Sequence, residues 1–138
     1  MEMVLRFFAF YYHSQNYRSP MKDFLNRYMA SNRNLERQSD KELTKIFEET
    51  TAVIFEAIGT KAFRPVRAIN AAVIDSVMTG VARRVSAGPI KKIEQLAHHY
   101  RLLMDNKDYW DAVQTGTSQE ANVKTRMDIA TKEFALVK

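Results

Sequence analysis

The feature that most constrains the fold is an apolar stretch at residues 64–84 whose charges lie mainly near its two ends. Five of its apolar residues recur at three- and four-residue steps: Val66, Ile69, Val73, Val77 and Val81. This spacing places them on one face of an α-helix. Between Ile69 and Ala82 the only charged residue is Asp75. A helix this apolar must be covered on most sides, so the stretch predicts a buried central helix at roughly 66–86.

The end of this helix is marked by four residues of different chemistry. Arg83 and Arg84 close the apolar run, where positive charge suits the negative end of the helix dipole. Gly88 favours a left-handed stop, and Pro89 can begin a following helix because that position needs no amide hydrogen. The sequence therefore predicts a boundary between two helices at Gly88.

The rest of the chain also shows helical spacing. Ser19 and Pro20 predict an N-cap and first turn, and Ser39 with Glu42 predicts a capping box. Six further helices are expected, at residues 1–12, 20–29, 39–59, 90–105, 108–114 and from 120 nearly to the C-terminus. No alternating strand pattern competes with them. The 138 residues, 46% of them hydrophobic, are enough for one core. We therefore predict an all-α, compact bundle of about six or seven helices in a single domain, 1–138.

Composition and motifs argue against several function classes. Without cysteine there is no disulfide framework or thiolate chemistry, and the cytoplasm is the simplest location. No uncharged apolar run approaches the roughly 18 residues of a membrane span. Adjacent His98 and His99 would point about 100° apart on a helix and could not share a metal ion. Phosphate-loop, dinucleotide and nucleophile-elbow motifs are absent. We expect no metal, no cofactor and no complete enzyme in this chain.

The positive charge is concentrated in one segment. Residues 60–92 hold seven Lys or Arg against Asp75 alone, although the whole chain is only +5. Such clustering can indicate a surface that binds polyanions, but a set of solvated helix ends is the interpretation we favour. A turn at Gly88 and Pro89 would bring two helix ends together. The sequence then predicts one local cationic patch, a candidate DNA-binding surface: Arg83, Arg84, Lys91 and Lys92.

A second candidate site is a polar cleft at the start and middle of the central helix, formed by Arg64, Arg67, Asn70 and Asp75. A carboxylate inside an apolar helix must be paired, hydrogen-bonded or turned to solvent. The interpretation we favour puts Asp75 on a narrow polar stripe with Thr79 and Arg83, at four-residue steps. The alternative pairs Asp75 with an arginine in the cleft. For Asn70 a helix cap is favoured over a cleft residue.

Four blocks occur in a familiar order: LRFFAF, MKDFLNRYM, KAFRPVRAINAAVIDSVM and NVKTRMDIA. In this order the chain resembles the helical C-terminal part of the ParB-like domain family typified by the GmrSD modification-dependent restriction endonuclease. The resemblance covers nearly the whole chain, although each block is mostly a packing pattern. It implies a bacterial defence setting in which the complete domain handles nucleotide triphosphates and an HNH-type domain cuts DNA.

The chain departs from that family at its catalytic parts. The Asp-Gly-Gln-Gln-Arg signature and the His-Asn-His nuclease module are both absent, so no catalytic residue can be assigned. The resemblance thus predicts a non-catalytic helical subdomain whose partner is the missing N-terminal ParB-like half or an HNH-type nuclease. A truncated gene product, an expressed fragment and a stand-alone relic all fit, as monomer or homo-oligomer. The alternative function is a stand-alone helical protein that binds nucleic acid through segment 60–92.

Overall fold

The computed structural model describes residues 2–138, so Met1 of the first predicted helix lies outside it. Within that range it contains helices and no strand, which confirms the all-α prediction. The α-helices are α1 (Glu2–His13), α2 (Met21–Ser31), α3 (Asp40–Ala57), α4 (Ala71–Ser86), α5 (Glu94–Asp105), α6 (Lys107–Gln114) and α7 (Glu120–Phe134). Two 3₁₀ turns, η1 (Ser14–Asn16) and η2 (Thr60–Phe63), were not predicted.

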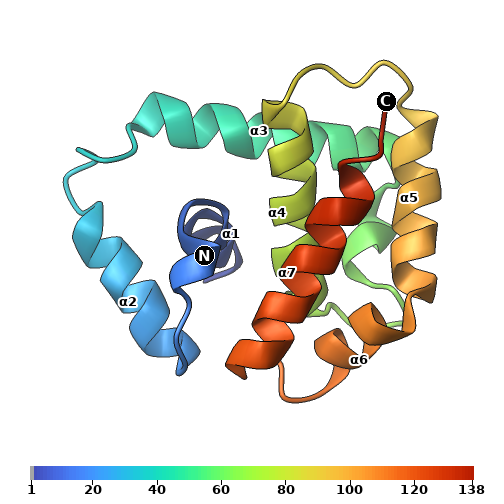
Figure 1. Cartoon of the computed structure of the whole chain (residues 1–138). Coiled ribbons are helices and arrows are strands. Elements are labelled where there is room, and N and C mark those ends of the chain that lie inside the picture. Colours follow the sequence, from blue (N-terminus) through green and yellow to red (C-terminus); the bar gives the residue numbers. More distant parts are fainter. Residues whose placement is uncertain (1) are drawn as a thin grey trace.

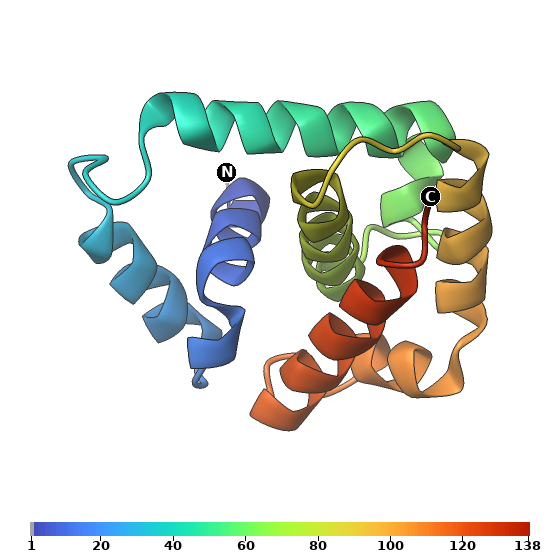
Figure 2. The same ribbon diagram turned by 45° about the horizontal axis from the view of Figure 1, so that its top comes forward.

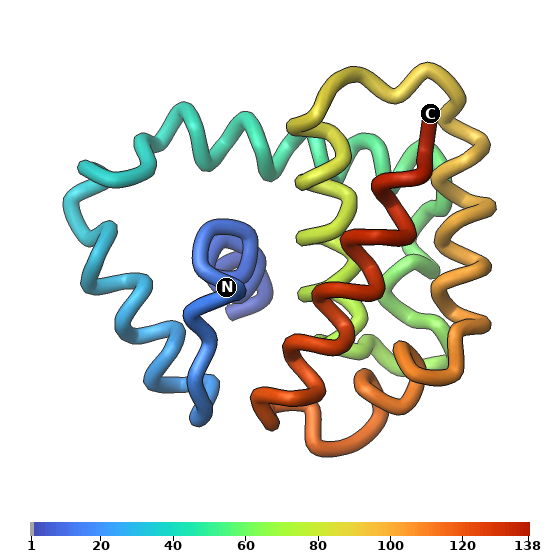
Figure 3. Tube along the Cα trace, in the orientation of Figure 1, coloured from blue at the N-terminus to red at the C-terminus, as the bar shows by residue number. Residues whose placement is uncertain are grey.

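Helix α4 is central, as predicted, and packs against α7, α1 and α3 (Figure 1). Helix α3 runs along one side of the molecule, with α2 near its start and α5 near its end (Figure 2). Helices α5 and α6 pack against α7. The C-terminus lies beside the α4–α5 connection (Figure 3), where the Lys138 carbonyl accepts from the backbone amides of Lys91 and Lys92.

Two groups of buried side chains hold the helices together. The larger surrounds α4 and includes Val73, Val77 and Val81, which are fully buried as the sequence predicts. The smaller joins α1, α2 and α7 through residues such as Phe10 and Phe24. Since burying apolar surface is the main favourable term in folding, both groups stabilise the packing of the helices, and the larger group includes Ile46 and Ile54 of α3.

The start of α4 differs from the prediction. The helix begins at Ala71 instead of about residue 66, because the Asn70 side chain accepts a hydrogen bond from the Val73 amide at 3.1 Å. This confirms Asn70 as a cap. Val66 and Ile69, expected on the buried face, precede the helix and are 73% and 52% exposed.

Three other boundaries can be compared with the sequence. Ser39 caps α3 as expected, since its hydroxyl oxygen accepts from the Glu42 amide at 3.2 Å. The residue before α2 is Pro20 rather than Ser19, and its side chain forms no cap. Helix α5 starts at Glu94 and not directly after Pro89. Between Pro89 and Glu94, the backbone amides of Lys91 and Lys92 donate to the Lys138 carbonyl, and these two residues lie outside the helix.

Helices α4 and α7 approach closely at Gly80. A Cβ atom there would lie 2.9 Å from Cδ2 of Phe134 and 3.0 Å from the carbonyl oxygen of Ala130. The first separation is shorter than real Cβ contacts and the second is tighter than most, so a side chain at this position would force Phe134 or the backbone of α7 to shift where the two helices cross.

No helix in residues 2–138 is both long enough and apolar enough to cross a membrane.

Candidate functional site

A surface groove of about 550 Å³ lies where the end of α3, the segment after it and α5 meet. These elements lie together on the right of Figure 1. We call this the α3–α5 groove. Its apolar lining comes from Ala57, Ile58, Pro65, Val66, Ala97 and Met104, and its charged lining from Lys61, Arg64, Arg101 and Asp105. The groove therefore combines exposed apolar surface with charge.

The floor of the groove is fixed by Tyr100 of α5. Its hydroxyl donates to the carbonyl oxygen of Ala62 at 2.9 Å, which ties α5 to η2. Burial raises the pKa of Tyr100 to about 12, so the phenol remains a neutral donor at ordinary pH. Gly59, with φ of +86°, turns the chain from the end of α3 into η2. The wall and floor are thus positioned by local backbone structure.

The rim of the groove is the loop 63–70. The loop is closed where the Asn70 amide donates to the Phe63 carbonyl at 3.0 Å. The Asn70 side chain also donates to the Val113 carbonyl at 2.9 Å, which anchors the loop to α6. Val66, at its outer edge, is the more exposed of the loop's two large aliphatic side chains. An aliphatic residue held outward by a fixed loop can contact a partner.

The charges of the groove are unbalanced. Three cationic side chains (Lys61, Arg64 and Arg101) face one carboxylate, Asp105, which gives a net charge of +2. None of the four forms an ion pair with any of residues 2–138. Unpaired cations beside apolar surface favour a ligand that carries both carboxylates and apolar side chains.

The predicted polar cleft is not formed, and the interpretation that placed Asp75 on a solvent-facing stripe is wrong. Asp75 is 0% exposed and lies between two arginines from other helices. Arg6 of α1 donates to both carboxylate oxygens, with its Nε 2.9 Å from Oδ1. Asp75 is thus paired with arginine, as the alternative required, but not with the exposed Arg64 or Arg67.

The second partner, Arg126 of α7, is wholly buried. Its Nη2 lies 3.3 Å from Oδ2 of Asp75, and its Nη1 donates to the Thr117 carbonyl at 2.6 Å. Burial lowers the pKa of Arg126 even though the Asp75 charge opposes that change. Burial also lowers the pKa of Arg6. The hydrogen bond to Asp75 and the charge of Asp75 outweigh this effect, so the pKa of Arg6 is raised. This buried cluster joins α1, α4 and α7.

The four residues of the predicted cationic patch have different surroundings. The Arg84 guanidinium donates to the carbonyls of Val137 at 2.6 Å and Gly88 at 2.8 Å. Arg83 donates to the hydroxyls of Thr131 and Ser14, and burial lowers its pKa. Only the side chains of Lys91 and Lys92 are exposed. Binding of nucleic acid here stays a prediction, now based chiefly on the two lysines.

Sequence reasoning missed Arg6, Arg126 and the α5 side of the groove. Two of these had a signal. Arg6 is the one charged residue between Met3 and His13 in a strongly apolar segment, and Arg126 lies three residues after Val123 and four before Ala130, on the apolar face of α7. A cation among core positions indicates a buried carboxylate partner. The groove had no such signal, because it depends on how α3 and α5 pack.

The rings of His98 and His99 lie side by side, with centroids 5.2 Å apart, whereas the ring of His13 lies 5.6 Å from that of Tyr28. His99 lies 2.5 Å from a Glu133 oxygen through its Nδ1, whereas His98 is exposed. Across the part of the chain that the structure describes, no group of three or more His, Asp or Glu side chains is arranged to hold a metal ion.

Comparisons with protein-family models, with curated proteins and with solved structures found no match to this chain.

Proposed function

We propose that this chain is a non-catalytic helical docking module that holds an acidic, partly apolar segment of a partner protein in the α3–α5 groove. The observation that carries the proposal is the groove itself: exposed Val66 and three unpaired cations lie on one surface. Apolar contact supplies affinity there, and the cations favour an acidic partner over a basic one.

The resemblance of the four sequence blocks supports a setting for this docking. In that setting the chain is the helical subdomain of a nucleotide-dependent DNA restriction or defence protein in the cytoplasm. The occupant of the groove is then an acidic segment of the ParB-like N-terminal half or of an HNH-type nuclease. The chemistry of cutting and of nucleotide turnover belongs to that partner.

The test is selection of random 16-residue peptides displayed on phage against the immobilised chain. We expect enrichment of peptides that combine Asp or Glu with Leu, Ile or Phe. A synthetic copy of an enriched peptide, followed by fluorescence anisotropy, should bind the Arg64→Glu/Arg101→Glu variant at least tenfold more weakly. The matched control is Lys41→Glu/Lys45→Glu on exposed positions of α3, which makes the same charge change outside the groove.

Four outcomes would contradict the proposal. The first is no enrichment of acidic peptides, and the second is equal loss of affinity in both double variants. The third is saturable binding of duplex DNA that the Arg64→Glu/Arg101→Glu change abolishes, which would assign the groove to nucleic acid instead. Concentration-dependent dimerisation lost in the same variant would assign it to a second copy of the chain.

A further inference from the structure

Helix α3 packs on the other helices with one face, and residues 2–138 leave the opposite face uncovered. In Figure 2 every other helix lies on one side of α3. Five exposed residues recur along the uncovered face at four- and three-residue steps: Lys41, Lys45, Glu48, Ala52 and Phe55. Residues with this spacing form a straight seam along a helix, as in coiled coils. We call these five residues the α3 seam, which extends over about 21 Å.

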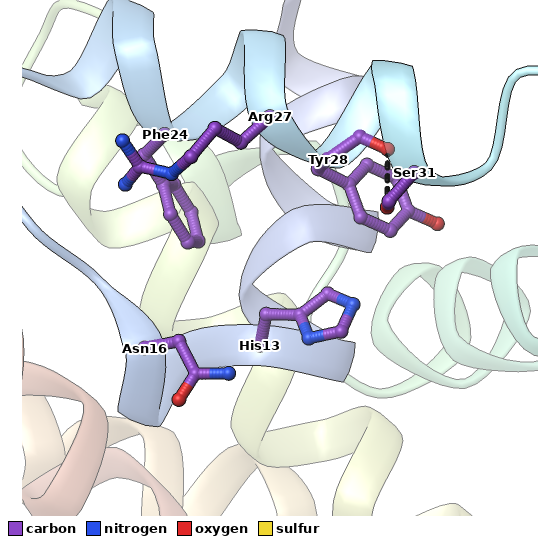
Figure 4. A pocket seen from close by; sticks show the side chains of 6 residues that line it. All are labelled: His13, Asn16, Phe24, Arg27, Tyr28 and Ser31. Atoms are coloured by element: carbon purple, nitrogen blue, oxygen red, sulfur yellow. Dashed lines mark hydrogen bonds between the residues drawn. The ribbon is translucent and has the colours of Figure 1, made fainter.

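Phe55 protrudes from the α3 seam. It is 67% exposed and is the one exposed aromatic residue among residues 2–138. The other aromatic residues are buried or half-buried, as are Phe24 and Tyr28 beside the cavity between α1 and α2 (Figure 4), at 3% and 6% exposed. Ala52, one turn before Phe55, is too small to cover the ring. An aromatic ring that a helix holds in water is suited to anchor an interface.

A shallow hollow of about 410 Å³ lies in the first half of the same helix face. Its lining is Asp40, Lys41, Thr44, Lys45, Glu48 and Glu49. Its centre lies about ten residues before Phe55, which corresponds to about 15 Å along the helix. Asp40 and Glu49 lie about 90° to either side of the seam and so at the edges of the hollow. An aromatic ring can pack on the aliphatic stems of Lys41 and Lys45 while their ammonium groups stay in water.

The charges of the exposed face differ between its two halves. Lys41 and Lys45 are the cations of the first half, and Glu48 and Glu56 are the carboxylates that follow. None of the four forms an ion pair with residues 2–138. Two copies that place α3 antiparallel, about a two-fold axis near residue 50, bring the Phe55 ring of each copy to the hollow of the other. Glu56 of each copy then lies beside Lys45 of the other, whereas a parallel pair would place like charges opposite each other.

From these features we infer that the α3 seam is a homodimer interface, in which two copies pack α3 antiparallel and each inserts Phe55 into the hollow of the other. The occupant is a second copy because the ring, the hollow and both charges lie on one helix face at matching distances, which makes the face complementary to itself. One helix face per copy is at the small end of specific interfaces, so the association is weak and reversible. The seam is separate from the α3–α5 groove, so the inference stands or fails independently of the docking proposal.

The test is sedimentation equilibrium of the chain at about 10 µM to about 1 mM, the range in which small interfaces dissociate. We expect the apparent mass to rise from 16.0 kDa towards twice that value as the concentration increases. Phe55→Ser should weaken association at least tenfold, because it removes the anchor. Position 55 is exposed, so the variant should fold, which circular dichroism checks. The matched control is Leu136→Ser, at a residue outside α3 that is 60% exposed, which should associate like the unmodified chain.

A charge exchange tests the antiparallel arrangement itself. Lys45→Glu and Glu56→Lys should each weaken association, and the chain that carries both changes should regain it, because the two reversed charges then meet across the two-fold axis. A chain that stays monomeric at all these concentrations would overturn the inference. So would a dimer that Phe55→Ser leaves intact, or a double variant that associates no better than the single ones. A dimer that is lost in Arg64→Glu/Arg101→Glu and kept in Phe55→Ser would place the contact in the α3–α5 groove instead.

Discussion

Arg6 and Asp75 are 69 residues apart in the sequence, yet Nε of Arg6 donates to Oδ1 of Asp75 at 2.9 Å. The contact joins α1 to α4, and Arg126 extends it to α7. Two guanidiniums thus share one carboxylate inside the protein. Removing the charge of the shared partner would leave Arg126 buried without a counter-charge and Arg6 with only Glu2, 3.9 Å away, which is among the largest costs that a single substitution can impose.

We therefore expect Asp75→Asn, which keeps the side-chain size, to lower the free energy of unfolding by about 3–5 kcal/mol. Urea unfolding followed by circular dichroism measures the loss. The control is Asp111→Asn, whose carboxylate lies 2.8 Å from Lys107 on the surface and should matter far less. The Asp75→Asn loss should persist in 1 M NaCl, since salt screens buried pairs little. Equal losses in the two variants would contradict this role.

The corrected start of α4 gives a second prediction. Val77→Asp buries an unpaired carboxylate in the core and should cost several kcal/mol, enough to unfold a marginally stable domain. Val66→Asp makes the same change at an exposed loop position and should melt like the unmodified chain. Thermal melts of both variants decide it. Unfolding caused by Val66→Asp would indicate instead that Val66 is buried and that the central helix begins near residue 66.

The close approach at Gly80 gives a third prediction. In an exposed helix, replacing glycine by alanine would stabilise by about 1 kcal/mol. At Gly80 the new methyl group would press on Phe134 and on the backbone of Ala130, so we expect Gly80→Ala to destabilise by about 1–3 kcal/mol instead. Chemical denaturation of Ala52→Gly, at an exposed position of α3, measures the intrinsic helix effect in the same protein. A more stable Gly80→Ala variant would show that the helices can separate at little cost.

The fourth prediction is that the purified chain neither hydrolyses nucleotide triphosphates nor cuts DNA, with or without magnesium. The lining of the α3–α5 groove holds no nucleophile beside a general base. Phosphate release and plasmid nicking are the measurements. A hydrolytic or nuclease activity that co-purifies with the chain at constant specific activity, and that the Arg64→Ala substitution removes, would contradict the prediction.

The fifth prediction concerns DNA. Because Arg84 is held by backbone carbonyls, we expect at most two phosphate contacts, from Lys91 and Lys92. The slope of log K against log salt on duplex DNA should then be about −1.8, and binding should vanish near physiological salt. Lys91→Glu/Lys92→Glu should abolish the binding seen at low salt. A slope near −3.6, at about −0.9 per contact, would show instead that all four cations of the predicted patch contact phosphate.

The helices could be predicted because their signals are local. The Ser39 cap of α3 and the apolar spacing of α4 act within a few residues of the chain, and both are found in the structure. The start of α4 was misplaced because Val66 and Ile69 continue the apolar spacing into a loop. Spacing alone does not distinguish an aliphatic residue that packs in the core from one that faces solvent.

The surroundings of Asp75 could not be predicted because they depend on distant residues. Its partners lie 69 and 51 positions away in the sequence, and which of the available arginines reach it is decided by helix packing. The same holds for the α3–α5 groove, whose walls come from three separate elements. The spacing of residues along one helix predicts which face of the helix a side chain lies on. It does not predict which residues of other helices pack against that face.

The closed loop 63–70 has a consequence for the speed and strength of association. Backbone and side-chain bonds of Asn70 hold the loop at Phe63 and at Val113 before any partner arrives. A partner that contacts Val66 therefore loses little free energy to ordering this rim, so more of the contact energy remains as affinity. Such a preformed surface also requires no slow rearrangement, and encounter with an oppositely charged segment can proceed at an electrostatically assisted rate.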